Sequence, residues 1–159
     1  MPSVGAEAAR LATIDDLPAI DRVWTAVNAA VQEHRGGALF LRRESGGAAM
    51  DRARELVDHS DGLVVVGTYD GVVLGYGIGA VESLDDGGLL GRIDDLVVEA
   101  EAREVGIGES IMNLLIGEFR ARGCFGVDSR ALPGDRHTKN FFESFGLKAR
   151  LLVVHRELD

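Results

Sequence analysis

The residues best suited to chemistry are an arginine and two glycines between an apolar run and an amphipathic stretch. Arg103, Gly106 and Gly108 form the pattern R-x-x-G-x-G, which follows residues 93–98 and precedes a helical periodicity. The first turn of a helix carries unpaired backbone N–H groups and the positive end of the helix dipole, so it attracts phosphate. Glycines let an anion approach the backbone, and arginine adds a charged donor. The pattern therefore predicts a phosphate-binding loop.

The spacing of this loop excludes two common phosphate sites. A dinucleotide fingerprint, G-x-G-x-x-G, would need a third glycine where Ile111 stands, and no β-α-β unit opens the segment. A nucleoside-triphosphate loop would end in G-K-[ST], which does not occur in this sequence. The loop therefore belongs to another class of phosphate site.

Hydrophobic periodicity predicts the elements that position the loop. Helices are expected from Ile14 to before Gly36, around residues 50–57, from residue 107 to Gly123, and around residues 141–145. Strands are expected at residues 63–69, 72–83, 91–99, 124–132 and 149–157, and Asp70-Gly71 predicts a hairpin turn. The first three of these strands form an antiparallel meander. The β-α-β step around the helix that starts at residue 107 makes strands 91–99 and 124–132 parallel.

Three motifs resemble those of the GNAT superfamily of acyl-CoA N-acyltransferases. Residues 10–17 look like the first strand and helix start of that family. Leu96-Val97-Val98-Glu99 followed by Arg103 looks like its central strand and its coenzyme A pyrophosphate loop, and residues 141–147 look like its late helix. The resemblance covers nearly the whole chain and implies a single GNAT-like domain over residues 1–159. It implies an α/β fold with a mixed, mostly antiparallel central sheet, a splayed parallel strand pair and about four flanking helices.

The resemblance implies acetyl-CoA as cosubstrate, bound where the central strand and its parallel neighbour splay apart. Backbone groups of Leu96 to Val98 would pair with the pantetheine arm, and the N–H of Val98 would donate to the thioester oxygen as that oxygen gains charge. Asp135 stands where relatives often have an asparagine that touches the pantetheine. The expected cofactor contacts are Leu96, Val97, Val98, Arg103, Glu104, Val105, Gly106, Ile107, Gly108, Glu109, Ser110, Asp135 and Phe142.

The implied reaction is direct attack of a primary amine on the thioester, without a covalent enzyme intermediate. A base must take a proton from the ammonium, directly or through water. Asp94 is the first candidate, because strand alternation places it on the same face as Leu96 and Val98. A β-bulge would switch that parity in favour of Asp95, and Glu82 on the adjacent strand is the third candidate.

Three positions depart from the family pattern. Ala100 replaces the usual proline after the central strand, and Glu104 replaces a common glycine, which weakens the attraction for phosphate. Phe142 stands where the family often has the tyrosine that protonates the leaving thiolate, and phenylalanine has no proton to give. A degenerate member that binds acyl-CoA without turnover, as a sensor or interaction module, is therefore the alternative. An unrelated phosphate-binding regulatory domain would rest on the loop alone.

Composition and charge limit the class of protein. The length of 159 residues suits one domain, and 17 basic against 26 acidic residues argue against a nucleic-acid partner. The four histidines show no metal-like spacing and Cys124 is alone, so we expect no metal, no disulfide and a reducing compartment. No apolar run is long enough for a membrane helix, and residues 1–12 lack a signal-peptide pattern. We expect a cytoplasmic protein without a membrane partner, and the resemblance adds a possible homodimer.

Two further patterns concern packing and specificity. Gly75, Gly77 and Gly79 alternate on one face of their strand, which indicates room for a packed helix, with a floor under a ligand as the alternative. Residues 36–47 lie between the first two expected helices, a region that often shapes the acceptor pocket in the family. If Arg42 or Arg43 faces that pocket, an acceptor with an acidic group becomes plausible.

Overall fold

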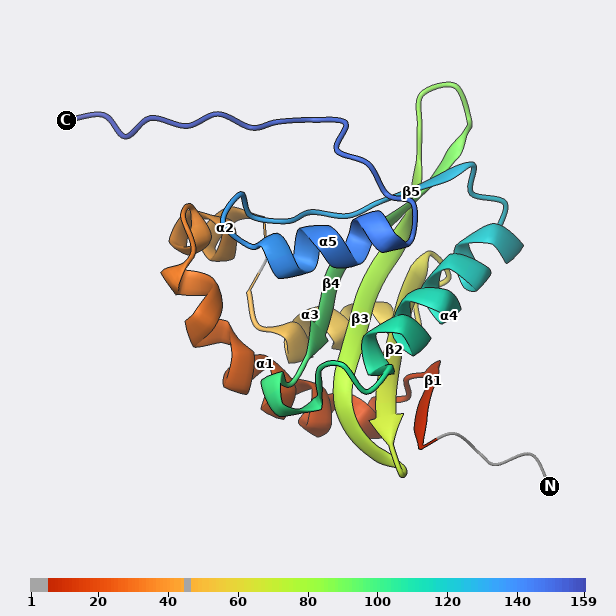
Figure 1. Cartoon of the computed structure of the whole chain (residues 1–159). Coiled ribbons are helices and arrows are strands. Elements are labelled where there is room, and N and C mark those ends of the chain that lie inside the picture. The colour runs from red at the N-terminus through yellow and green to blue at the C-terminus, as the bar shows by residue number, and fades with distance from the viewer. Residues whose placement is uncertain (1–5, 45–46) are drawn as a thin grey trace.

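A five-stranded sheet with the order β1-β2-β3-β4-β5 forms the centre of the molecule (Figure 1). The structure, a computed structural model, describes residues 6–44 and 47–159. The strands are β1 (Glu7–Leu11), β2 (Gly62–Tyr69), β3 (Val72–Ser83), β4 (Leu89–Val98) and β5 (Gly126–Asp128). Neighbouring strands from β1 to β4 are antiparallel, and β4 and β5 are parallel. The expected mixed sheet with one parallel pair is therefore confirmed.

Helices cover both faces of the sheet (Figure 1). They are α1 (Leu17–Glu33), α2 (Gly37–Arg43), α3 (Ala49–Leu56), α4 (Ile107–Ala121) and α5 (Arg136–Ser144), with short 3-10 turns at Ile14–Asp16 and Ala100–Ala102. The helices α1 and α3 pack on one face, while α4 and α5 pack on the other. None of the helices in the described part of the chain combines the length and apolar character that a membrane crossing requires.

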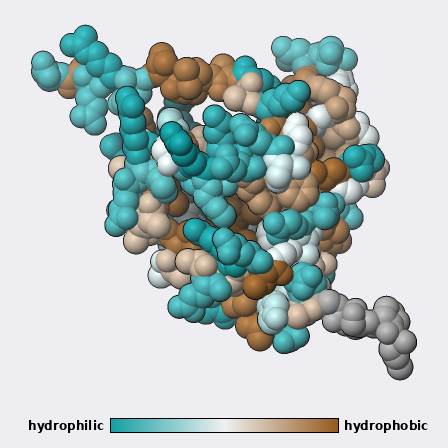
Figure 2. All heavy atoms as spheres, viewed as in Figure 1, coloured by the Kyte–Doolittle hydropathy of each residue, from teal (hydrophilic) through white to brown (hydrophobic). Residues whose placement is uncertain are grey.

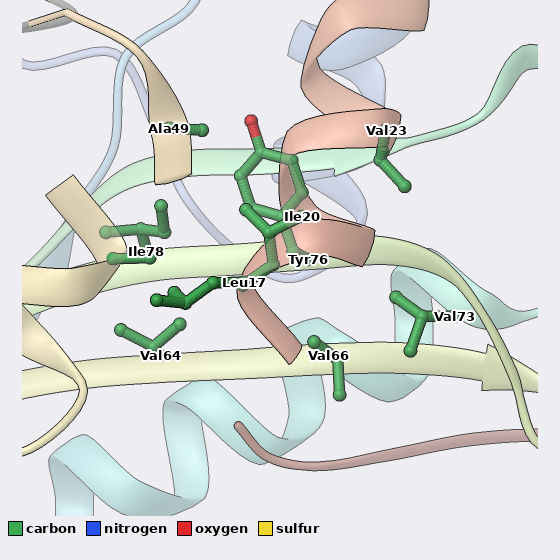
Figure 3. Packing of buried hydrophobic residues seen from close by; sticks show 10 residues of the cluster. Leu17, Ile20, Val23, Ala49, Val64, Val66, Val73, Tyr76 and Ile78 are labelled. Atoms are coloured by element: carbon green, nitrogen blue, oxygen red, sulfur yellow. The ribbon is translucent and has the colours of Figure 1, made fainter. Parts of the chain in front are cut away.

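The strand β2 divides its side chains between the two hydrophobic cores. Val64 and Val66 pack with α1 and α3, whereas Leu63 and Val65 pack with α4. This alternation follows from the two-residue period of a strand, and β2 reads as a continuous apolar run because both of its faces are buried. Figure 3 shows the first core, with residues of α1 and α3 over β2 and β3 and the ring of Tyr76 among them.

The glycines of β3 make room for α4, as the packing interpretation predicted. A Cβ at Gly77 would lie 3.0 Å from side-chain atoms of Ile111 and Leu115, both on α4. At Gly75 it would lie 2.9 Å from the Val97 carbonyl oxygen and 3.1 Å from Ile111. The row of small residues therefore lets the helix sit close to the sheet, and the same helix begins at the predicted phosphate loop.

The helix α2 was missed in the sequence because its glycines resemble a loop. Gly36 lies between α1 and α2 and adopts a φ of 77°, in the left-handed region that favours glycine. A Cβ at Gly37 would lie 1.8 Å from the Val31 carbonyl oxygen, so the turn between the two helices has no room for a side chain at position 37. Ser45 and Gly46, which belong to the expected specificity region 36–47, lie outside the described residues, as do residues 1–5 of the segment used for the signal-peptide prediction.

The C-terminal segment corrects two strand predictions. Only Gly126–Asp128 of the expected strand 124–132 is a strand, and the strand expected at 149–157 is wrong, because residues 147–159 form neither helix nor strand. Its consecutive residues Leu151 to Val154 are 72–83% exposed, and Figure 2 shows them as brown spheres on the segment that leaves the body at the upper left. A β-forming composition gives a strand only where a sheet edge pairs with it.

Removal of residues 151–159 is expected to leave the thermal midpoint Tm within about 2 °C of the full-length value, because this segment buries almost no apolar surface within its own chain. Thermal unfolding followed by circular dichroism checks this. The substitution Leu115→Ala, at a fully buried position, calibrates the measurement with an expected cost of about 2–5 kcal/mol. A loss of more than about 5 °C on truncation would mean that the exposed aliphatic side chains are covered in solution.

Candidate active site

The strands β4 and β5 separate after a short stretch of pairing. They pair only through Leu90 with Gly126, Gly91 with Val127, and Arg92 with Asp128. From residue 93 to residue 98, no described strand pairs with the edge of β4 that faces β5. The hydroxyl of Ser129 donates to the carbonyl oxygen of Ile93 at 3.3 Å, where the gap begins. The central strand therefore presents an open backbone edge at its carboxyl end.

The direction of the backbone groups along this edge follows from one hydrogen bond. The N–H of Glu99 donates to the carbonyl oxygen of Leu74 on the β3 side at 2.9 Å. Since successive residues of a strand direct their N–H groups to opposite edges, the N–H of Val98 points to the open edge. The same alternation directs the N–H and carbonyl groups of Leu96 to that edge.

A cavity of about 300 Å³ lies along the open edge. Its floor is the end of β4 from Asp94 to Val98, and one wall comes from α1 and α2. The opposite wall combines the loop before α4, the segment 129–135 and α5. This volume is at the lower end of the range of small-molecule sites. The cavity thus joins the open strand edge to the predicted phosphate loop.

The loop before α4 places part of its residues in the cavity. Arg103, Glu104, Gly108 and Glu109 line it. Three other expected contacts do not: Val105 is 40% exposed, Ile107 is buried in the core beneath α4, and the hydroxyl of Ser110 donates to the carbonyl oxygen of Gly106 at 2.9 Å. Gly106 precedes the helix with a φ of 90° and also lies outside the cavity lining.

Glu104 occupies a backbone conformation that favours glycine. Its φ is 72°, in the left-handed region where a side chain costs about 1–2 kcal/mol. The departure noted in the sequence, glutamate in place of the family's glycine, thus carries backbone strain as well as a negative charge at the loop. Its side chain is exposed at the rim of the cavity.

A β-bulge in β4 decides where the two adjacent aspartates point. Ile78 of β3 is opposite Asp95, and Gly79 is opposite Ile93, so Asp94 is the extra residue of the bulge. The simple alternation that placed Asp94 on the face of Leu96 is therefore wrong, because the extra residue interrupts the two-residue period. Both aspartates nevertheless line the cavity.

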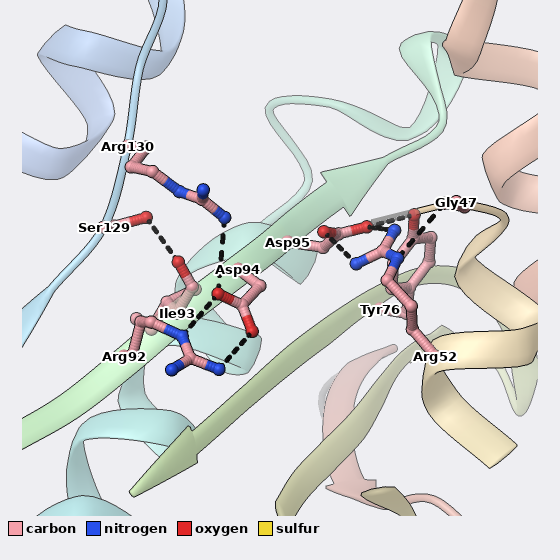
Figure 4. Close-up of polar contacts among 9 residues, drawn as sticks. All are labelled: Gly47, Arg52, Tyr76, Arg92, Ile93, Asp94, Asp95, Ser129 and Arg130. Atoms are coloured by element: carbon pink, nitrogen blue, oxygen red, sulfur yellow. Dashed lines mark hydrogen bonds and ion pairs between the residues drawn. The ribbon is translucent and has the colours of Figure 1, made fainter. Parts of the chain in front are cut away.

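Asp95 is fully engaged in a buried ion pair (Figure 4). Arg52 of α3 donates to its two oxygens at 2.6 and 2.7 Å, and the hydroxyl of Tyr76 donates to it at 3.0 Å. The side chains of Arg52 and Asp95 are 13% and 10% exposed. Burial raises the pKa of Tyr76 well above its usual range, and the charge and hydrogen bond of Asp95 raise it further. Asp95 therefore joins α3, β3 and β4 through these three contacts.

Asp94 lies toward the gap between β4 and β5 and is held by two arginines (Figure 4). Arg92 donates to it at 2.7 and 3.2 Å, and Arg130 donates at 3.3 Å from the segment after β5. Its side chain is 16% exposed. Glu82, the third candidate base, is 46% exposed, lies 3.8 Å from Arg92 and does not line the cavity. Of the three candidate bases, Asp94 and Asp95 line the cavity, and Asp94 is the one directed toward the gap between β4 and β5.

A model of the acetyltransferase (GNAT) family matches residues 27–147, a stretch that contains the open edge of β4, the phosphate loop and α5. The chain belongs to the GNAT acetyltransferase family. Members of this family use acetyl-CoA and an acceptor. The family resemblance seen in the motifs is thereby confirmed.

Proteins with diverse names are similar to this GNAT acetyltransferase. Glucosamine 6-phosphate N-acetyltransferase 1 of Oryza sativa subsp. japonica is 39% identical over 46 residues, which cover 29% of this chain and 28% of that protein. A tetramutant protein from Bacillus halodurans matches with a TM-score of 0.79 at 22% identity, over 94% of this chain and 99% of that one. An aminoglycoside acetyltransferase from an uncultured soil metagenomic sample, solved with sisomicin, matches with a TM-score of 0.70 at 18% identity, over 96% and 95% of the two chains. The two structures show the same fold.

The remaining expected site residues of the acetyltransferase are the N-cap residue of α5 and one residue within that helix. Asp135 caps this helix, accepting from the N–H of Thr138 at 3.1 Å and from its hydroxyl at 2.6 Å, and it lines the cavity. Phe142 also lines the cavity, and its ring is buried against the core beneath α4. Among the residues that the structure describes, no group of three or more histidine, cysteine, aspartate or glutamate side chains is arranged to hold a metal ion.

Sequence reasoning missed the residues that form the other wall and the partners of the aspartates. Trp24, Val27 and Val31 of α1 line the cavity. Their signal was the apolar helical spacing from Leu17 to Val31, which continues beyond the buried residues of the helix. Tyr76 had a signal as well, because a tyrosine flanked by Gly75 and Gly77 presents a polar hydroxyl in an otherwise apolar strand. No sequence signal distinguished Arg52 and Arg130 from the other arginines.

Substitution of Arg52 by methionine is expected to destabilise the protein by about 3–5 kcal/mol, because it leaves the buried carboxylate of Asp95 without its counter-ion. Chemical denaturation measures this as a fall in the free energy of unfolding. Arg54→Met on the same helix is the matched control. The Arg54–Asp51 pair is exposed, so the change there should cost less than about 0.5 kcal/mol. Equal costs at the two positions would contradict the structural role assigned to Arg52.

Proposed function

We propose that this GNAT acetyltransferase transfers an acetyl group from acetyl-CoA to a primary amine by direct attack in a ternary complex. The observation that carries the proposal is the single cavity that joins the open edge of β4 to the N-terminus of α4. An acyl-CoA has two parts that match these features. Its pyrophosphate is an anion that suits a helix N-terminus, and its pantetheine arm carries amides that can pair with a strand edge.

The phosphate end of acetyl-CoA is assigned to the loop before α4. Arg103 supplies a charged donor, and Gly108 lies in the first turn of the helix, where backbone N–H groups have no intrahelical partner. The pantetheine arm then runs along Leu96, Val97 and Val98 of the open edge. This arrangement brings the thioester to the widening gap between β4 and β5.

The backbone of Val98 is assigned the role of oxyanion donor. When the amine attacks the thioester carbon, the carbonyl oxygen gains negative charge, and a fixed donor at that position stabilises the transition state by a few kcal/mol. The direction of the Val98 N–H supports this role, since it points to the open edge. No side chain is needed for this step.

Asp94 is assigned the role of base, directly or through a water molecule. It takes one proton from the acceptor ammonium, and the free amine then forms the new C–N bond. The tetrahedral intermediate collapses with cleavage of the C–S bond, and the departing thiolate takes up the proton released from the nitrogen. The overall change converts an ammonium and acetyl-CoA into an acetamide, free coenzyme A and one proton. A tyrosine at position 142 is not required for this balance.

Thermal unfolding with and without saturating acetyl-CoA, followed by an assay of thiol release with amines, tests the proposal. A ligand that binds only the folded state adds about 2.7 kcal/mol at a hundredfold excess over Kd, or about 5–11 °C for a chain of this size. Such a shift together with amine-dependent thiol release is the expected result. A shift without turnover would favour the alternative of an acyl-CoA sensor or interaction module. No shift at millimolar acetyl-CoA would contradict the assigned cofactor site.

The substitution Gly108→Val is expected to weaken acetyl-CoA binding by at least about tenfold with little loss of stability. A Cβ there already lies 3.3 Å from the ring of Phe141, and the valine methyl groups extend into the cavity where phosphate would approach. Isothermal titration calorimetry measures the change. Gly117→Val, on the same helix with no atom within 4 Å of its added Cβ, is the matched control. Wild-type affinity in Gly108→Val would remove the loop assignment.

The substitution Glu104→Gly is expected to raise both stability and acetyl-CoA affinity. Relief of the left-handed strain is worth about 1 kcal/mol, or roughly 2–4 °C in Tm, and removal of the negative charge should tighten phosphate binding by about two- to fivefold. Glu104→Gln separates the two effects, since it removes the charge and keeps the side chain. It should improve affinity alone, and a gain in Tm equal to that of the glycine variant would refute the strain argument.

The substitution Asp94→Asn is expected to lower kcat by about 10²- to 10⁴-fold while the Kd for acetyl-CoA stays unchanged. The amide keeps the shape of the side chain but cannot accept the proton. Steady-state rates between pH 6 and 9, with calorimetric titration of acetyl-CoA, give both quantities. An unchanged rate over this range would exclude Asp94 as base, and a comparable loss in Glu82→Gln would transfer the role to that residue.

A further inference from the structure

The wall formed by α1 and α2 bounds the half of the cavity that the acetyl-CoA assignment leaves free. Trp24, Val27 and Val31 follow one another on α1 at helical spacing, and Phe40 and Leu41 of α2 complete this apolar wall. The segment after β5 adds Ala131 and Leu132. Because α1 also packs against β4, the wall stands directly across from the bulge that carries Asp94.

One polar atom in this wall has no partner. Asn28 lies on the cavity side of α1, four residues after Trp24, and its Oδ1 atom is buried. Among the described residues, it is the one buried side-chain nitrogen or oxygen atom without a hydrogen bond. An amide oxygen only accepts hydrogen bonds, and burying it unpaired is unfavourable. Its position in a ligand cavity indicates that a ligand supplies an N–H donor.

The charges near this wall do not favour a polycation. Asp95 is neutralised by Arg52, and Asp94 is shared by Arg92 and Arg130. The guanidinium of Arg130 also lies 5.4 Å from the centre of the Phe40 ring, which puts a positive charge beside the apolar wall. A second ammonium group close to the Phe40 ring would therefore meet the positive charge of Arg130.

The α1–α2 wall itself contributes the polar side chains of Asn28 and His34, and no arginine or lysine. Arg42 and Arg43, which would favour an acidic group, do not line the cavity, and Arg43 instead lies 3.4 Å from Glu44. A sugar carries several hydroxyl groups, each of which must find a partner when it leaves water. This side offers mainly aliphatic and aromatic surface, which favours an acceptor with an apolar body.

We propose that the acceptor is a monoamine on an apolar body, which packs on the α1–α2 wall while Asn28 Oδ1 accepts a hydrogen bond from its amino group. The inference rests on the proposed acetyl transfer and specifies its second substrate. It makes Asn28 a binding residue that orients the amine toward Asp94 and the thioester. The amine nitrogen is then held between two acceptors, Asn28 and Asp94, when its lone pair attacks the thioester carbon.

A panel of acceptors tests the class of substrate. Thiol release from acetyl-CoA is measured with 2-phenylethylamine, with glucosamine 6-phosphate and with sisomicin. We expect kcat/KM for 2-phenylethylamine to exceed the other two values by at least tenfold. A higher value for the sugar phosphate or for the aminoglycoside would overturn the inference and leave the transfer reaction intact.

The variant Asn28→Leu tests the role of the unpaired oxygen. It should raise KM for 2-phenylethylamine by at least about tenfold, with KM for acetyl-CoA unchanged and Tm unchanged or higher. Asn28→Asp, which keeps an acceptor at this position, should retain the low KM. Gln32→Leu on an exposed position of α1 is the matched control. A change in Tm without a change in the amine KM would show that Asn28 is only structural.

Failure of the transfer reaction can be told apart from failure of the inference. If acetyl-CoA binds but no amine is turned over, calorimetry of 2-phenylethylamine with the coenzyme A-loaded protein decides. Binding that Asn28→Leu weakens and Asn28→Asp retains would support the amine site without catalysis. No detectable binding would overturn it.

Discussion

The separation of β4 from β5 after Arg92 is the constraint on which the site depends. A sheet gains stability by pairing its edges, so an unpaired stretch inside it must be held open by other contacts. The Arg52–Asp95–Tyr76 network ties the end of β4 to α3 and β3, on the side away from β5. The bulge at Asp94 changes the strand direction at the same point, and Ser129 closes the gap at its start. Polar contacts on both sides of β4 therefore hold open the gap to β5, which apolar packing alone would close.

Two neighbouring aspartates show how this opening divides structural from chemical roles. Asp95 is buried, accepts three hydrogen bonds from Arg52 and Tyr76, and holds elements together. Asp94 lies one residue earlier, yet it faces the gap and accepts hydrogen bonds from Arg92 within β4 and from Arg130 after β5. The two adjacent carboxylates therefore differ in their partners and in their position relative to the gap.

The parts of the fold that sequence predicted are those set by local periodicity. The continuous apolar run of β2, the stripe of α4 and the loop from Arg103 to Gly108 each carry their signal within a few residues. The bulge does not, since Ile93-Asp94-Asp95-Leu96 has two adjacent polar residues and nothing in it tells which of them is the extra one. The helix α2 was hidden by Gly36 and Gly37, whose role depends on the close approach of Val31. The strand predicted at residues 149–157 was wrong for the opposite reason, because the composition of this segment favours a strand but no edge of the sheet pairs with it. Asn28 became notable only when its surroundings were known.

The open edge of β4 has a consequence for how such an enzyme diverges. On the proposed assignment, the acyl donor is held through backbone groups, which are the same for every amino acid. The acceptor, in contrast, meets side chains such as Trp24, Val31 and Phe40. Mutational drift along α1 and α2 would therefore alter the choice of amine while the donor half of the site persists. A fold shared at 18–22% identity by proteins with different names is what such uneven tolerance to substitution would produce.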